Sequence, residues 1–147
     1  MCRAHATVRG LLQEMLLGAD DTCWVVVDLE AGVEVMSRAT PRAVDVLFVV
    51  VEPYHRALEL GRHLVRLGSE LGIPRVEVIA NKVRGETEKG LIVEYCGRHG
   101  LPLRLVVPWD EHAYRAEQTG SGSVGAVPPT IAQAAGRLAE DLLSPRG

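Results

Sequence analysis

Two uninterrupted apolar runs constrain the fold of this chain more than any other feature. Residues 23–28 read CWVVVD, and residues 44–52 read VDVLFVVVE. Runs without alternating polar positions are typical of strands that are covered on both faces of a parallel sheet. Pro53 prevents the second strand from continuing. Two further strands are predicted over RVEVIANK and LPLRLVVP, which end at Lys82 and Pro108.

Helical patterns separate these strands. The segment 54–71 carries an apolar stripe of Ala57, Leu60, Leu64, Leu67 and Leu71. Further helices are predicted over 4–17, over 86–100, in a short segment opened by Asp110, and near the C-terminus with Ile131, Ala134, Ala135, Leu138 and Leu142 buried. Strands that alternate with helices predict an α/β fold, Rossmann-like and three-layered, with a mainly parallel sheet and flanking helices. We expect a single domain over residues 1–143.

Charge and cysteine content narrow the classes of partner. The net charge is −3, from 19 acidic and 16 basic residues, so no broad basic surface is available for nucleic acid. The three cysteines lack CxxC spacing, which favours a reducing compartment. Since no apolar run reaches the roughly 18 residues that a membrane helix needs, we expect a cytoplasmic protein without a membrane partner.

Polar or turn-forming residues follow every predicted strand. Because the carboxyl ends of parallel strands meet at one edge of a sheet, where ligands bind, these residues indicate a shared site. They are Asp28, Glu30 and Gly32, then Glu52 and Pro53, then Asn81 and Lys82, then Pro108 and Asp110.

Asp28 is the strongest candidate among them. A carboxylate at the tip of a buried strand suits Mg²⁺ held through water, and Gly32 would let its backbone N–H approach a phosphate oxygen. The alternative is that Asp28 caps the AGVEV turn. For Glu30 and Glu34, the alternative to a role in the site is that each is only a solvated charge.

The segment Asn81-Lys82-Val83-Arg84 can be compared with the NKxD motif of guanine-binding GTPases. Arg84 stands where that motif has an aspartate, and a guanidinium offers no acceptor to the guanine edge. The amide of Asn81, which has both a donor and an acceptor, suits adenine instead. A role as a strand-end turn residue remains the alternative for Asn81.

The order of these motifs resembles the MinD/ParA-like P-loop ATPases of the SIMIBI class. The similar blocks are VVVDLEAGVE, VVVEPYHRALELGRHL, IPRVEVIANKV and VVPWDE, and they are most similar to the CooC-type ATPases that support nickel insertion into carbon monoxide dehydrogenase. The resemblance implies that Asp28 is the magnesium aspartate and Gly32 the glycine that senses the γ-phosphate. It also places Asn81 and the Pro108-Trp109-Asp110 loop at the adenine. Cys2 falls near the family's metal-binding Cys-x-Cys pair, with an ordinary free thiol as the alternative.

One family element is missing from the sequence. Nothing in it resembles the glycine-rich GxxxxGK loop, and Lys82 and Lys89 lie in no such turn. The chain therefore resembles the C-terminal portion of a truncated P-loop fold. Mg-ATP binding and hydrolysis are expected of the complete protein, and hydrolysis by this chain alone should be poor. The resemblance also implies a homodimer or a pairing with a full-length homologue, and a metalloenzyme client.

Two other functions are compatible with the sequence. A degenerate, non-catalytic ATPase could act as an interaction or regulatory module. An unrelated receiver or flavodoxin-like domain would explain Asp28 and Lys82, but the acidic pair that a receiver needs is missing.

In the family's sheet the loop-bearing strand lies between the two apolar strands, so residues 23–28 and 45–51 should pair directly or accept a strand from another chain. We also expect the DNA upstream of the codon for Met1 to encode a glycine-rich lysine loop. Intergenic sequence with its own ribosome-binding site would contradict this expectation.

Overall fold

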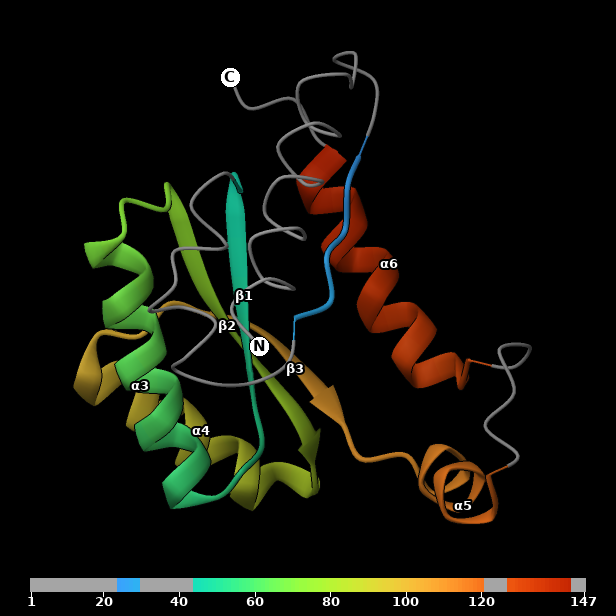
Figure 1. Ribbon diagram of the computed structural model, residues 1–147. Helices are drawn as coiled ribbons and strands as arrows, with labels where there is room; N and C mark the ends of the chain where they lie inside the picture. The colour runs from blue at the N-terminus through green and yellow to red at the C-terminus, as the bar shows by residue number, and fades with distance from the viewer. Residues whose placement is uncertain (1–23, 30–43, 121–126, 144–147) are drawn as a thin grey trace. The chain divides into compact units, whose positions relative to one another are not determined.

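A computed structural model of the chain describes residues 24–29, 44–120 and 127–143. In chain order its elements are β1 (Val46–Val51), α3 (His55–Glu70), β2 (Arg75–Val83), α4 (Gly85–His99), β3 (Leu103–Pro108), α5 (Glu111–Thr119) and α6 (Pro129–Leu143), as labelled in Figure 1. The predicted strands over 44–52, 75–82 and 101–108 and the four predicted helices between residues 54 and 143 are therefore confirmed, to within a few residues. The predicted helix over 4–17 lies outside the described residues.

The described residues fall into two compact units. One consists of Arg66–Val76 together with the described residues before Phe48, and the other consists of Phe48–Val65 and the described residues from Glu77 onward. The expectation of a single domain over 1–143 stays a prediction. Within the described residues we find no helix with the length and hydrophobicity that a membrane crossing requires.

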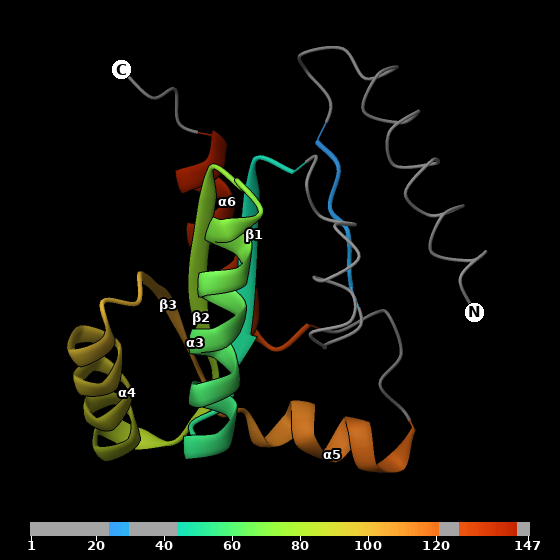
Figure 2. The same ribbon diagram turned by 60° about the vertical axis from the view of Figure 1, so that its left-hand side comes forward.

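The strands form a three-stranded parallel sheet in the order β1-β2-β3. In the second unit α4 and α6 pack against β3, and Figure 2 shows them on opposite sides of the sheet. Ile92 and Cys96 of α4 are almost fully buried, and the pKa of the Cys96 thiol is raised by this burial. The predicted α/β fold with a parallel sheet and flanking helices is confirmed.

Helix α3 packs against the strands through glycines. Leu58, Gly61 and Gly68 are buried, whereas Leu60, which was placed in the predicted apolar stripe, is 42% exposed. A Cβ atom on Gly61 would lie 2.5 Å from Cγ1 of Val51. A Cβ atom on Gly68 would lie 2.9 Å from Cγ2 of Val76, within the first unit. The predicted stripe was wrong at Leu60 because a hydrophobicity pattern does not register glycine as a packing residue.

The prediction of a buried strand over 23–28 was also wrong. Residues 24–29 form neither helix nor strand, and Trp24 and Val26 are 60% and 93% exposed. An apolar run becomes a strand only where its N–H and C=O groups pair with a neighbouring strand. Since residues 24–29 join no ladder, the direct pairing expected with residues 45–51 is not formed. A strand donated by another chain stays a prediction.

The glycine contact can be tested by adding one methyl group. Gly61→Ala should destabilise the protein by about 1–3 kcal/mol, because the new Cβ would overlap Val51. The matched control is Gly90→Ala in α4, where a Cβ meets nothing within 4 Å, and it should stabilise the protein by about 0.5–1 kcal/mol. Urea unfolding midpoints measure both changes. A Gly61→Ala protein as stable as wild type would show that α3 does not need this close approach.

Candidate functional site

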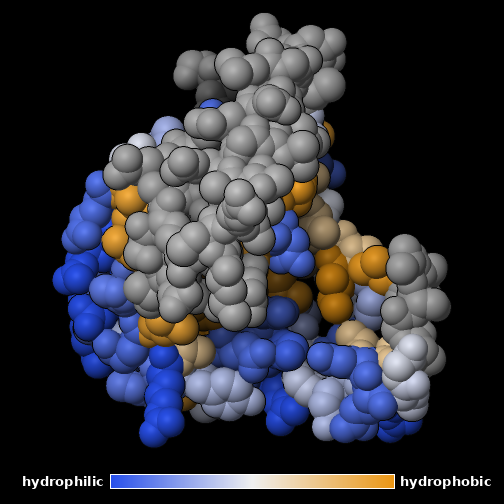
Figure 3. Space-filling view, viewed as in Figure 1, coloured by the Kyte–Doolittle hydropathy of each residue, from blue (hydrophilic) through white to orange (hydrophobic). Residues whose placement is uncertain are grey.

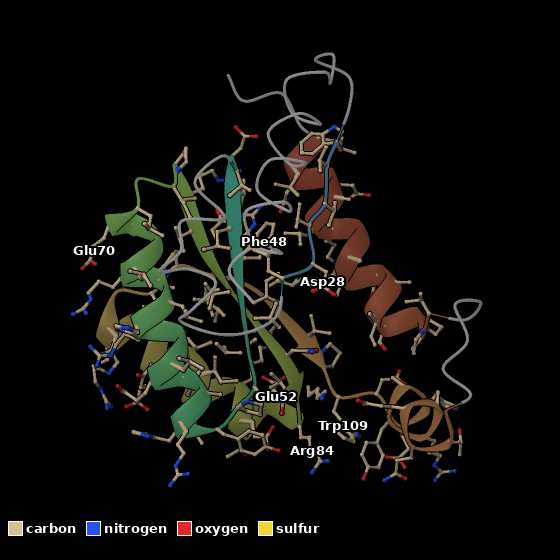
Figure 4. All side chains as sticks on the ribbon, viewed as in Figure 1. Asp28, Phe48, Glu52, Glu70, Arg84 and Trp109 are labelled. Atoms are coloured by element: carbon tan, nitrogen blue, oxygen red, sulfur yellow. The ribbon has the colours of Figure 1, made fainter. Side chains whose placement is uncertain are left out.

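The carboxyl ends of the three strands meet at one edge of the sheet. Glu52 follows β1, Lys82 lies at the end of β2, and Trp109 follows β3. Figure 4 shows Glu52, Arg84 and Trp109 gathered at this end, and the corresponding rim in Figure 3 is mostly hydrophilic. The sequence-based expectation that these strand ends share an edge is confirmed for β1, β2 and β3.

An irregularity in the ladder between β2 and β3 shapes this edge. Ala80 pairs with Val106 and Val83 with Pro108, so the register shifts across the two residues between Ala80 and Val83. Lys82 has φ +59°, a left-handed conformation that costs a residue with a side chain about 1–2 kcal/mol. Such bulges bend a strand and redirect its side chains.

The redirected side chain of Lys82 bonds to the neighbouring strand end. Its Nζ donates to Oε1 of Glu52 at 3.0 Å, and this hydrogen bond raises the pKa of Lys82. Because both side chains are about 40% exposed, we expect the pair to contribute less than about 1 kcal/mol to stability. The main effect of the ion pair is that it fixes the position of the Lys82 ammonium group at the site.

Next to this ion pair lies an open cleft of about 450 Å³. The guanidinium of Arg84 lies 4.0 Å from the centre of the Trp109 ring. The ring centroids of Trp109 and Tyr114 are 4.9 Å apart, and the angle between the two ring planes is 46°. A cation over an aromatic face is attracted to it. The cleft is lined by Glu52, Tyr54, Lys82, Arg84, Trp109, Tyr114, Glu117 and Gln118.

A second, smaller pocket of about 90 Å³ adjoins the cleft. Among its lining residues are the positions that the family resemblance assigned to adenine, which are Asn81, Pro108, Trp109 and Asp110. The structure thus brings these four residues together. Oδ1 of Asn81 accepts a hydrogen bond from the backbone N–H of Lys82 at 2.9 Å. A contact of any of the four with a base stays a prediction.

Asp110 also has a structural role, as its predicted place before a helix suggests. Its Oδ1 accepts hydrogen bonds from the backbone N–H groups of His112 and Ala113, which makes it the N-cap of α5. Its Oδ2 accepts a hydrogen bond from the hydroxyl of Thr130 at the start of α6. These bonds, first that from Ala113, lower the pKa of Asp110 because they favour the charged carboxylate.

The structure does not place the remaining predicted site residues at this edge of the sheet. Asp28 is exposed and belongs to the first unit, so its place at the same edge stays a prediction, as does its role as a magnesium ligand. Gly32 and Cys2 lie outside the described residues.

Sequence reasoning missed the packing of Arg84 on Trp109 and the contribution of Tyr114 and Glu117. Arg84 was interpreted from the sequence only as the loss of an acceptor. The available signal was helical spacing in α5, since Glu117 and Gln118 follow Tyr114 by three and four residues and so lie one turn from it on the same face.

Comparison with known proteins shows what this chain is similar to. No family model matches the chain. An ATP-binding protein of Methanocaldococcus jannaschii is 35% identical over 121 residues, which are 82% of this chain and 46% of that protein. The carbon monoxide dehydrogenase accessory protein CooC of Rhodospirillum rubrum is 34% identical over 120 residues, 82% of this chain and 44% of CooC. A second ATP-binding protein of M. jannaschii is 33% identical over 112 residues, 75% of this chain and 43% of that protein.

The fold and the polar edge define a Rossmann-like α/β protein with its candidate site at the ends of parallel strands. Together with the three similarities, they show that the chain belongs to the family of CooC-like P-loop ATPases. The chain spans about half the length of the curated relatives that it matches.

The capping role of Asp110 predicts a specific response to acid. Since its pKa is lowered on folding, its contribution to stability is present above the ordinary value of 3.8 and is lost as the pH falls through the lower, folded value. In Asp110→Asn the loss of stability on acidification should be shallower than in wild type. Thr130→Val should show part of this change, because it removes one of the three donors. Urea midpoints between roughly pH 5 and pH 2 measure it; identical acid slopes in wild type and Asp110→Asn would contradict the assignment.

Proposed function

We propose that this chain forms the base-binding part of an adenine-nucleotide site in a CooC-type ATPase. One observation carries the proposal: the ends of β1, β2 and β3 converge on a cleft of about 450 Å³ that offers aromatic faces beside charged groups. Open parallel sheets bind their ligands at this edge. Relatives that are called ATP-binding proteins are similar to 75–82% of the chain, which supports a nucleotide as the ligand.

The charge at the cleft mouth favours adenine over guanine. Guanine presents N–H donors on its Watson–Crick edge and needs an acceptor opposite them. The guanidinium of Arg84, held over Trp109, is a donor only. In adenine the ring nitrogen N1 is an acceptor where N1 of guanine carries a hydrogen, so a donor such as Arg84 can pair with it.

The proposal extends to magnesium binding and to ATP hydrolysis. The carboxylate of Asp28 is exposed, and an exposed hard oxygen is suited to hold Mg²⁺ through water. Magnesium would neutralise phosphate charge at that position. Phosphoryl transfer also needs a backbone cradle and lysine charge, and these 147 residues contain no GxxxxGK loop. We therefore assign hydrolysis to a complete site with a loop that this sequence does not carry.

The client of such an ATPase would be a metalloenzyme. One relative is called an accessory protein of carbon monoxide dehydrogenase. We propose a corresponding role for this chain in preparing a metal-containing enzyme.

The missing loop also favours a second candidate function, a non-catalytic module that pairs with a full-length homologue. Binding to such a homologue without any affinity for ATP in calorimetry would support this candidate over the first.

Calorimetric titration with and without Mg²⁺ tests the first proposal. ATP should bind more tightly than GTP by roughly tenfold or more, because the N–H donors of guanine would face the Arg84 guanidinium, which offers no acceptor. Asp28→Ala should remove the dependence of ATP affinity on Mg²⁺ while leaving adenosine affinity unchanged. Asp45→Ala, at another exposed carboxylate, is the matched control and should behave like wild type. Equal affinity for GTP, or no nucleotide binding, would refute the proposal.

A further inference from the structure

The open edge of β1 lacks the features that usually protect a strand edge. Among the described residues β1 pairs on one side only, with β2, so its other side is an edge of the sheet. The opposite edge is β3, which carries the charged Arg104 and ends at Pro108, and both features discourage pairing with a further strand. β1 reads VLFVVV and contains neither a charge nor a proline. An edge of this kind readily accepts another apolar strand.

One side-chain face of β1 is also incompletely covered. Val49 and Val51 are 5% exposed, and Val51 lies under α3 beside Gly61. Val50 points to the opposite face of the sheet and is 59% exposed. Strands of a parallel sheet are normally covered on both faces. The open edge of β1 therefore has an apolar side chain beside it that is available for contact.

The same chain contains an apolar segment that pairs with no strand. Along residues 24–29 exposed side chains alternate with half-buried ones, and the exposed ones are Trp24, Val26 and Asp28. This alternation is typical of an extended chain with one side facing outward. Burial of Trp24 and Val26, which are 60% and 93% exposed, would be favourable. Within the described part of the chain the segment joins no ladder.

We infer that two copies of this chain exchange residues 24–28, so that each copy lays this segment as a parallel strand along the open edge of β1 in the other. The exchange is reciprocal, as in a dimer with two-fold symmetry. It gives the segment a ladder, and it covers Trp24, Val26 and Val50 when these side chains lie on the same face of the sheet. Each copy supplies both an edge and a strand, so the pairing needs no further protein.

The length of the connecting chain permits this exchange. Residues 30–43 separate the segment from the described residues that lead into β1. A chain of that length reaches up to roughly 45 Å when extended. That reach is enough for the segment to extend from one copy to the β1 edge of a neighbouring copy.

The exchange bears on the candidate site, and this part of the inference rests on the proposed function. Parallel strands end at the same edge of a sheet, where ligands bind. Asp28 ends the exchanged segment as Glu52 follows β1, so the partner's Asp28 arrives at the edge that carries Glu52 and Lys82. The carboxylate proposed above for Mg²⁺ then comes to each site from the other copy.

Sedimentation equilibrium tests the dimer. Wild type should sediment as a dimer. Val26→Lys should raise the dissociation constant of the dimer by roughly a hundredfold or more, because it places a charge between the two copies, and Val50→Lys should do the same from the β1 side. Both positions are exposed in the single chain, so the monomers should stay folded, as circular dichroism checks. Leu91→Lys in α4, where the side chain is 61% exposed, is the matched control and should remain dimeric.

A mixing experiment tests the exchange of Asp28. The Asp28→Ala protein has no carboxylate to give, and the Val50→Lys protein does not accept the segment. Mg²⁺ should therefore not strengthen ATP binding by either variant alone. In an equimolar mixture, the intact edge of the Asp28→Ala copy receives the intact segment of the Val50→Lys copy. The Mg²⁺ dependence, measured by calorimetry, should return in the mixture.

The outcomes separate the claims. A monomeric wild type, or a Val26→Lys protein as dimeric as wild type, would overturn the inference. A wild type that is monomeric alone but pairs with a complete homologue through Val50 would also overturn it, because the edge then takes the homologue's strand. Mg²⁺ dependence in Val50→Lys alone would show that Asp28 acts within its own chain. If wild type binds no ATP, the proposed function fails, and sedimentation still decides whether the strand exchange occurs.

Discussion

The parallel pairing of β2 with β3 is the constraint on which the rest of the site depends. Its register brings Val83 beside Pro108, and the N–H of Trp109 continues the ladder by donating to the carbonyl of Val83 at 2.9 Å. The shift between Ala80 and Val83 then turns Asn81 and Lys82 out of the regular ladder. Without this pairing the two loops that line both hollows would have no common position.

The same few side chains hold the elements and shape the candidate site. Asp110 begins α5 and binds Thr130 of α6, so it fixes the helix that carries Tyr114 to the sheet edge. Lys82 links β2 to the end of β1 through Glu52. Residues of this kind place a binding surface accurately because their own positions are held by two or three bonds. A change at them would alter ligand binding and stability together.

Charge at the edge limits which ligand the chain can hold by itself. The cleft carries equal numbers of acidic and basic groups, and a cluster of phosphates gains little there. A phosphate-binding loop would add the backbone N–H groups and lysine charge that this sequence lacks. Under the proposed function, this charge balance is the reason for assigning the base to this chain and the phosphates to a separate loop.

The sequence by itself determined the alternation of strands and helices, the start of a helix at Asp110, and the gathering of strand ends at one edge. Each of these follows from local chain geometry or from the direction of parallel strands. Only the tertiary structure decided that α3 packs through Gly61, that residues 24–29 form no strand, and that Arg84 lies on Trp109. The physical reason is that these features depend on a partner far along the chain. The type and spacing of Gly61 do not show that the backbone of α3 comes close to Val51. In the same way, the sequence of residues 24–29 does not show whether a neighbouring strand is there to pair with, and the sequence around Arg84 does not show that Trp109 lies beside it.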